Sequence, residues 1–350
     1  MALLLAIATL AACTASEDAD PPTTPETVSV TSTADTSTSA SALPPSATTT
    51  TSVVTISDIV AASTGRPSPV QTIAGVGRFP YHVVSAFGSI WILAKSSSQV
   101  TRIDAVTGDV QAIIGVDDKG SSSMDRLAAS SDAIYVTARP LVRIDPTDNH
   151  TTVIDDGTFS TAVIAQGNDV WTANLRGVID HVAADGTITK LDLPNERWMD
   201  LAISNNLVWA LNQQQGVVTL ISFDPSTSKL VQRLDLPIDE KTMGVRLVAD
   251  ERNVIVGLDT SGGGGRTGAI VIVDPTTATI TDTVTLESRP EGIVLTDHYI
   301  WTSKAVIDRT TLDVTAVTLG FTIAQGPDGS IWAVSNAGGA VRYAPGDFKD

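Results

Sequence analysis

Cysteine, basic residues and aromatic residues are all scarce in this sequence. Of its 350 residues one is a cysteine, so an internal disulfide and a cysteine-based zinc cluster are both excluded. Lys and Arg number 22 against 39 Asp and Glu, and the resulting net charge of −17 argues against a nucleic-acid partner. The apolar run at residues 2–12 is well short of the ~20 residues that a membrane-spanning helix needs.

The sequence nevertheless has enough apolar material to fold. Hydrophobic residues make up 42% of the chain and charged residues 17%. At this length the chain is large enough for two average domains, or for one large β-propeller or barrel. Six tryptophans stand out among the few aromatic residues, and most of them recur at regular intervals.

The N-terminus joins a short apolar segment to a cysteine. Residues 2–12 end in the letters LAA, directly before Cys13. This pattern resembles the lipobox of bacterial lipoproteins, in which the preceding peptide is removed and the cysteine is lipidated. The alternative, a cysteine buried in a core, does not suit a position ahead of a polar tract. The resemblance implies a signal peptide over residues 1–13, lipidation at Cys13, and a membrane-anchored, extracytoplasmic protein of the cell envelope.

Residues 14–68 are rich in Ser, Thr and Pro. The first 39 of them contain 12 Thr, 8 Ser and 5 Pro, and no Lys, Arg or aromatic residue. Such a composition buries too little apolar surface to offset the entropy of ordering the chain. We therefore predict a disordered linker over 14–68 that tethers a domain beginning at residue 69.

From residue 69 onward the sequence repeats a β-type pattern. Seven runs carry a bulky central residue, and successive centres are 31 to 46 residues apart, about the length of one four-stranded propeller blade. Most of the following runs end in turn residues such as Asp-Pro. Nothing between residues 69 and 346 has a sustained helical period. The central residues are Trp91, Tyr135, Trp171, Trp209, Ile255, Trp301 and Trp332.

The repeat predicts an all-β fold, a seven-bladed β-propeller over residues 69–350. The seventh blade lacks its last strand, whereas residues 70–76 read as a last strand that precedes the first blade. We expect this N-terminal strand to pair with residues 340–343 and close the ring, because closure removes an exposed sheet edge. Five tryptophans share one repeat position, so we expect them to pack between neighbouring blades.

Several runs carry the motifs of a known class of propeller. The runs VRIDP (142–146), RPEGIV (289–294) and GPDGSIW (326–332) resemble YVTN-type and streptogramin-lyase-like β-propeller repeats. The resemblance extends over most of the chain after residue 69 and implies the propeller fold. It implies little about activity, because one fold carries many functions.

The loops after the second strand of each blade, and the connections between blades, are longer and less uniform than the other turns. Binding sites usually lie on variable loops held by a rigid scaffold, so we expect the functional face on this side. Aligning the blades on their central residue picks out one position near the start of each innermost strand, at the channel mouth. That position is occupied by His82, Arg126, Ala162, Asp200, Arg246, Gly292 and Thr322.

Four of these residues form a candidate binding ring: His82, Arg126, Asp200 and Arg246. Two arginines, an aspartate and a histidine around one channel suit an anionic or zwitterionic small molecule. The alternative is that they pair with one another and that water fills the channel. The next position is apolar in every blade: Val83, Leu127, Val163, Leu201, Leu247, Ile293 and Ile323.

We therefore predict a membrane-tethered, extracytoplasmic β-propeller lipoprotein that acts as a non-enzymatic binding module. It is expected to be a monomer whose ligand is a protein, a glycan or a small molecule, with no catalytic residue, metal or cofactor. Two alternatives stay open. One is an envelope assembly scaffold or sensor. The other is a streptogramin-lyase-like enzyme, in which a propeller-face histidine acts with an acid and magnesium; here only His82, with Asp200 or Glu291, has a comparable position.

Overall fold

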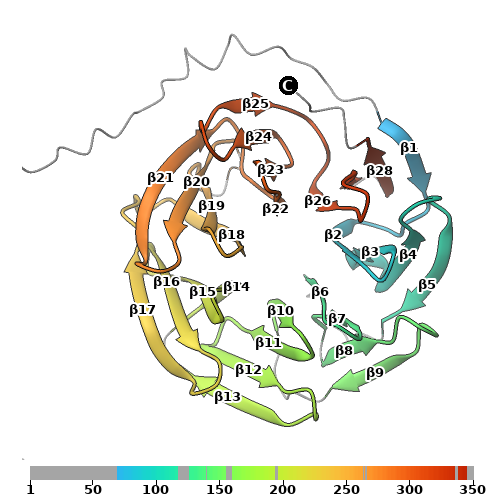
Figure 1. The fold of residues 1–350 in the computed structure, drawn as a ribbon, viewed down its shortest axis with the longest axis horizontal. Helices are drawn as coiled ribbons and strands as arrows, with labels where there is room; N and C mark the ends of the chain where they lie inside the picture. The colour runs from blue at the N-terminus through green and yellow to red at the C-terminus, as the bar shows by residue number, and fades with distance from the viewer. Residues whose placement is uncertain are drawn as a thin grey trace, which may run out of the picture. The chain divides into compact units, whose positions relative to one another are not determined.

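The computed structural model of the chain describes a ring of β-strands (Figure 1). The predicted signal peptide (1–13, with Cys13) and the predicted linker (14–68) lie outside the described residues. In the described part, the one helical element is η1, a single 3-10 turn at Lys95–Ser97, and no helix there is long and apolar enough to cross a membrane. The described residues are 69–116, 126–138, 140–154, 160–193, 196–262, 264, 266–335 and 338–344.

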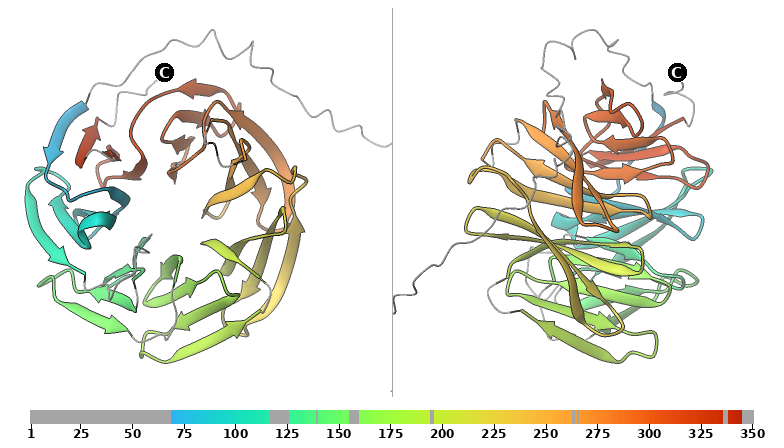
Figure 2. Two further views of the ribbon diagram at one scale, coloured as in Figure 1. Left: turned by 180° about the vertical axis from the view of Figure 1, so that it is seen from behind. Right: turned by 60° about the vertical axis from the view of Figure 1, so that its left-hand side comes forward.

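Seven antiparallel sheets of four strands each surround a central axis, which confirms the predicted seven-bladed β-propeller (Figures 1 and 2). In six blades the strands follow the chain from the axis outward. These strands are β2 (Pro80–Ala86), β3 (Ser89–Ala94), β4 (Gln99–Asp104), β5 (Val110–Gly115); β6 (Leu127–Ala129), β7 (Ile134–Val136), β8 (Leu141–Ile144), β9 (Thr151–Ile154); β10 (Ala162–Gln166), β11 (Asp169–Ala173), β12 (Val178–Val182), β13 (Ile188–Asp192); β14 (Trp198–Ser204), β15 (Leu207–Gln214), β16 (Val217–Asp224), β17 (Lys229–Asp235); β18 (Met243–Ala249), β19 (Val254–Asp259), β20 (Gly268–Asp274), β21 (Thr279–Leu286); and β22 (Ile293–Leu295), β23 (Tyr299–Thr302), β24 (Ala305–Asp308), β25 (Val314–Ala316).

The seventh blade is built from both ends of the described chain. Its strands β26 (Thr322–Gln325), β27 (Ile331–Ser335) and β28 (Gly339–Tyr343) are completed on the outside by β1 (Pro69–Ala74). Antiparallel partners such as Thr72 with Val341 and Ile73 with Ala340 confirm the predicted closure. Because β1 covers the edge of β28, the closing blade has the same four strands as the other six.

The turn between the third and fourth strands is stabilised by an aspartate in several blades. Asp145 and Asp274 each accept a hydrogen bond from the backbone N–H two residues later, at 2.8 and 2.7 Å. These backbone donors favour the carboxylate form, so they lower the pKa of Asp274, and the Thr147 hydroxyl and amide do the same for Asp145. The repeated Asp is therefore a local turn former rather than a ligand.

The core lies between adjacent blades. Trp91, Trp209 and Trp332 are fully buried, and each belongs to a cluster that also contains residues of the following blade. Trp171 and Trp301 pack in the same way against the fourth and seventh blades. The five tryptophans of the repeat position are thus structural, as their common spacing predicts.

Candidate functional site

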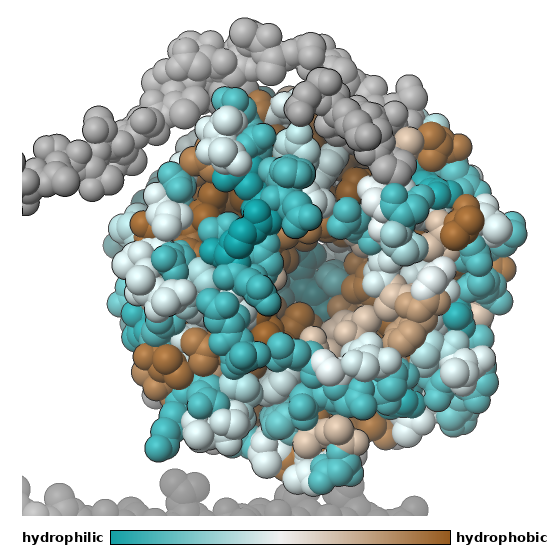
Figure 3. Space-filling view, viewed as in Figure 1, coloured by the Kyte–Doolittle hydropathy of each residue, from teal (hydrophilic) through white to brown (hydrophobic). Residues whose placement is uncertain are grey.

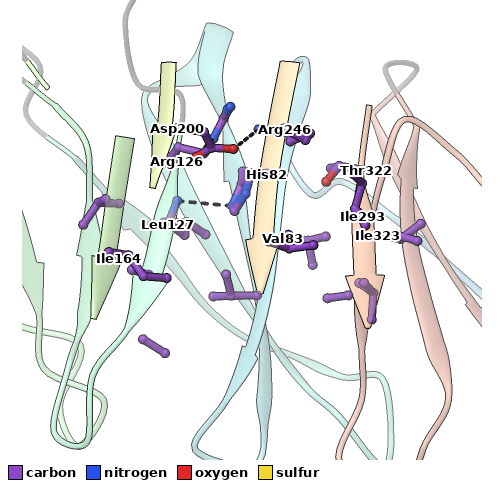
Figure 4. A pocket seen from close by; sticks show the side chains of 18 of the residues that line it. His82, Val83, Arg126, Leu127, Ile164, Asp200, Arg246, Ile293, Thr322 and Ile323 are labelled. Atoms are coloured by element: carbon purple, nitrogen blue, oxygen red, sulfur yellow. Dashed lines mark hydrogen bonds and ion pairs between the residues drawn. The ribbon is translucent and has the colours of Figure 1, made fainter. Parts of the chain in front are cut away.

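The four residues of the predicted ring line one cavity on the propeller axis (Figure 4). His82 lies on β2, Arg126 directly precedes β6, and Asp200 and Arg246 lie on β14 and β18, so each belongs to the inner edge of a different blade. The cavity has a volume of about 380 Å³ and is called the lower chamber below. The structure therefore brings the four side chains together, and their role in binding stays a prediction.

β-Bulges next to three of these residues set the direction of their side chains. The pairing between β2 and β3 shifts by one residue between Pro80 and His82, and equivalent shifts precede Asp200 and Arg246. A bulge bends the strand and re-aims the neighbouring side chains, and bulges are over-represented beside functional sites. The extra residues are Tyr81, Met199 and Val245.

Asp200 lies between the two arginines. Its Oδ1 is 3.6 Å from Arg126 Nε, and its Oδ2 is 4.0 Å from Arg246 Nη1, with none of the three side chains more than 10% exposed. The same carboxylate accepts hydrogen bonds from the backbone N–H groups of Leu201 (3.1 Å) and Leu247 (3.0 Å). These ion pairs are longer than the ~2.8 Å of a close arginine–carboxylate bond. The backbone donors, more than the guanidinium groups, therefore hold the carboxylate in place.

Arg246 has donor capacity that the described residues do not use. Its Nε donates to the backbone carbonyl of Glu291, but its buried Nη1 has no hydrogen-bond partner in the described part of the chain. Burial, followed by the charge of Arg126, lowers the pKa of Arg246 to about 10, although Asp200 opposes this shift. Arg246 is consequently charged at neutral pH, with an unsatisfied donor that favours an additional acceptor.

His82 is neutral at physiological pH. Burial, followed by the charges of Arg246 and Arg126, holds the pKa of His82 well below its ordinary value. Its Nδ1 accepts the backbone N–H of Leu127 from the next blade at 3.2 Å, which leaves the ring proton on Nε2. The ring therefore carries two positive charges and one negative charge. A net positive charge on side chains that are largely buried attracts an anion more strongly than the same charge on an exposed surface.

The wall of the lower chamber is apolar directly below the ring, in the direction of the turns between first and second strands. All seven apolar residues that follow the ring position line the chamber, and Figure 4 shows Val83, Leu127 and Ile293 among them. Ile164 and Val294 belong to the next layer. Seen along the axis, the centre of the propeller is hollowed, with hydrophilic residues inside the hollow and hydrophobic residues on parts of its rim (Figure 3).

A second cavity, the upper pocket, lies on the other side of Arg126 and Arg246 and has a volume of about 230 Å³. The bulge residues line it, together with two residues that the ring prediction did not include, Arg289 and Glu291. Arg289 Nε is 3.1 Å from Glu291 Oε1. They lie directly before Gly292, the ring position of the sixth blade, so alignment of the residues just before that position would have found them.

Neither acid named for the lyase alternative, Asp200 or Glu291, has a hydrogen bond to His82 among the described residues. Nδ1 of His82 accepts the Leu127 amide, and the Glu291 side chain pairs with Arg289. No group of three or more His, Cys, Asp or Glu side chains in this part of the chain is arranged to hold a metal ion.

Comparison with known proteins places the chain among β-propellers. No family model matches the sequence, and no curated protein matches it. The structure is similar to "Kuenenia stuttgartiensis Hydrazine Synthase" (TM-score 0.61, 14% identity), covering 78% of this chain and 96% of that one. It is also similar to the WD40 β-propeller domain of Doa1 (0.60, 14% identity; 81% and 97%) and to the Neurospora crassa Pan2 WD40 domain (0.59, 8% identity; 80% and 97%). At such low identity these similarities show the fold alone.

Proposed function

We propose that this protein is a binding module that holds a small anion at the axial ring of His82, Arg126, Asp200 and Arg246. One observation carries the proposal: the buried Nη1 of Arg246 has no hydrogen-bond partner among the described residues, and Asp200, 4.0 Å away, is shared with Arg126. A buried charge that lacks a full partner is costly, so a ligand that supplies the missing negative charge gains affinity from the same imbalance.

Two donors give the anion specific partners. Nη1 of Arg246 is buried and unsatisfied among the described residues, and Nε2–H is the His82 ring nitrogen that is not engaged by the Leu127 amide. Hydrogen bonds from a charged donor contribute about 1.5–3 kcal/mol, roughly twice as much as neutral ones. The proposed anion supplies an acceptor for these donors, while Asp200 keeps the backbone N–H groups of Leu201 and Leu247.

The test is a thermal-shift comparison of small solutes on the full chain. Acetate and phosphate are the anionic probes, methylammonium is the cationic probe and glucose is neutral. An anion that binds the native state raises the melting temperature by mass action, with about 2.7 kcal/mol of stabilisation at a hundredfold excess over Kd. We expect stabilisation by acetate or phosphate and none by methylammonium or glucose.

A pair of variants separates the ring from general salt effects. Arg246→Met should weaken anion binding at least about tenfold, because it removes the charge and the free donor. Arg252→Met removes an exposed arginine, whose side chain is 54% exposed, and should bind anions like the parent. Equal anion responses in the parent and in both variants would refute the ring as the binding site.

We also propose that the propeller is a lipoprotein, anchored outside the cytoplasm through Cys13 and the linker 14–68. The support is the sequence pattern described above, an apolar segment that ends in LAAC and precedes a Ser/Thr/Pro-rich tract. Expressed in its host, the parent should enter the membrane fraction, whereas Cys13→Ser should be recovered in the soluble fraction. If the Cys13→Ser protein stays in the membrane fraction, another feature of the chain anchors it.

A further inference from the structure

We propose that the anion is the carboxylate of an otherwise apolar molecule, with the carboxylate at the ring and the apolar body in the lower chamber. This inference rests on the proposed function and adds the chemical class of the ligand. Its basis is a change from charged to aliphatic side chains along one cavity. The ring, with two arginines and one aspartate, lies at one end of the chamber, and the wall next to it is made of aliphatic side chains.

The wall between the ring and the opposite end of the chamber has few polar side chains. Directly below the ring the wall residues are Val, Leu and Ile in all seven blades, and the next layer includes Val84, Ile164, Val248 and Val294. Below the ring, the polar side chains that line the chamber are Ser85 and Gln325. They lie at its lower mouth, the end farthest from the ring. Binding pockets of this kind hold the apolar body by burial of its surface, while a few polar groups fix its orientation.

The depth of the chamber limits the size of the apolar body. Along β2 the wall runs from His82 to Ser85, three residues, which corresponds to about 10 Å in an extended strand. A saturated chain with carbon–carbon bonds of about 1.5 Å advances roughly 1.3 Å per carbon, so about eight carbons span this depth. A carboxylate of this length places its end at the lower mouth.

The upper pocket offers a less suitable place for the apolar body. The Arg289–Glu291 pair and the amide of Gln213 line it, and Gln213 Nε2 donates to the Thr242 carbonyl at 3.3 Å. An apolar body there would remove water from charged groups without replacing their hydrogen bonds, which is unfavourable. The lower chamber imposes that cost only at the ring, where the carboxylate itself supplies the acceptor.

The test measures how affinity depends on chain length. Acetate, butyrate, hexanoate and octanoate are titrated into the full chain by NMR, at constant ionic strength. Burial of each added methylene contributes about 0.8 kcal/mol, which corresponds to roughly fourfold in affinity. We therefore expect Kd to fall by at least about tenfold from butyrate to octanoate.

Two variants locate the apolar body. Ala165 is a partly exposed residue that lines the end of the chamber away from the ring, so Ala165→Phe narrows the chamber at that end. It should lower the octanoate-to-acetate affinity ratio at least about tenfold, because the fourfold gain per methylene is lost when the chain has no room. The matched control is Ala316→Phe, an exposed position on the outermost strand β25, which should keep the parent ratio. Melting curves of both variants check that they fold.

Each outcome has a distinct meaning. A rising affinity that Ala165→Phe removes and Ala316→Phe keeps supports the inference. Binding that depends on Arg246 but not on chain length overturns the inference and leaves the proposed anion site standing. A gain with chain length that Ala165→Phe does not change also overturns it, since the apolar body then lies elsewhere. Failure of every carboxylate to bind overturns the inference, and it refutes the proposed function as well only if phosphate also fails to stabilise the protein.

Discussion

Two sets of residues recur once per blade, and they differ in almost every respect. At the centre of the second strand, five of seven residues are tryptophan, and they pack into cores shared by neighbouring blades. At the start of the innermost strand, the residues differ from blade to blade and four of them are charged or titratable. Uniformity at a repeat position indicates a packing requirement that every blade shares. Variation at an otherwise equivalent position that faces a common cavity supports the proposed binding site.

The difference also has an energetic side. The tryptophans contribute stability through buried apolar area, which every blade needs to hold its neighbour. The ring instead buries two guanidinium groups around one carboxylate, an arrangement that hydrophobic residues of similar volume would often match or exceed in stability. We therefore expect substitutions in the two sets to separate stability from binding.

The largest effect is expected at the tryptophan position. Trp209 is fully buried between the fourth and fifth blades, so Trp209→Ala leaves a large cavity and should lower the free energy of unfolding by about 3–5 kcal/mol. Urea denaturation measures this loss, and the octanoate affinity of the folded variant should match that of the parent. A loss below about 1 kcal/mol would mean that the position is not the packing element described here.

A smaller loss is expected from Asp200→Asn, which leaves both arginines without their shared carboxylate. We expect about 2–4 kcal/mol of destabilisation, because both buried guanidinium groups then lose the charge of Asp200. Carboxylate affinity should rise about tenfold at the same time, since the ring gains a further net positive charge. Urea denaturation with and without acetate tests both effects, and acetate should restore part of the lost stability. Unchanged stability together with unchanged affinity would contradict the charge account.

The sequence predicts the seven blades, but it does not predict the β-bulges and ion pairs at the ring. The Trp-centred runs and the Asp turns are local signals, so the seven sheets and the pairing of β1 with β28 followed from them. The bulges before His82, Asp200 and Arg246 depend on cross-strand pairing and left no mark in the repeat. The ion pairs of Asp200 with Arg126 and Arg246 also have no signal in the sequence, because their lengths depend on the distance between blades. The repeat spacing predicts which residues share the ring position, whereas the contacts between their charged groups come from the tertiary structure.

The smallest effect concerns pH and His82. The pKa of His82 in the folded state lies below its ordinary value of about 6.5, so the unfolded state binds more protons in the window below that pH. Stability is therefore complete above about pH 6.5 and falls as the pH is lowered, by about 1 kcal/mol between pH 7.5 and 5.5. His82→Asn keeps an acceptor for the Leu127 amide and removes this contribution. Urea denaturation at both pH values tests it, and an identical pH dependence in parent and variant would show that His82 is not the group responsible.

The most direct test of the ring is to see where a carboxylate binds. Crystals of the protein with 4-bromobenzoate locate the bromine by its anomalous scattering and the carboxylate by its density. The account predicts the carboxylate against the guanidinium of Arg246 and the Nε2 of His82, with the bromine below it in the lower chamber. A carboxylate bound away from Arg246, or a ring that stays empty while 4-bromobenzoate binds elsewhere, would contradict the central claim.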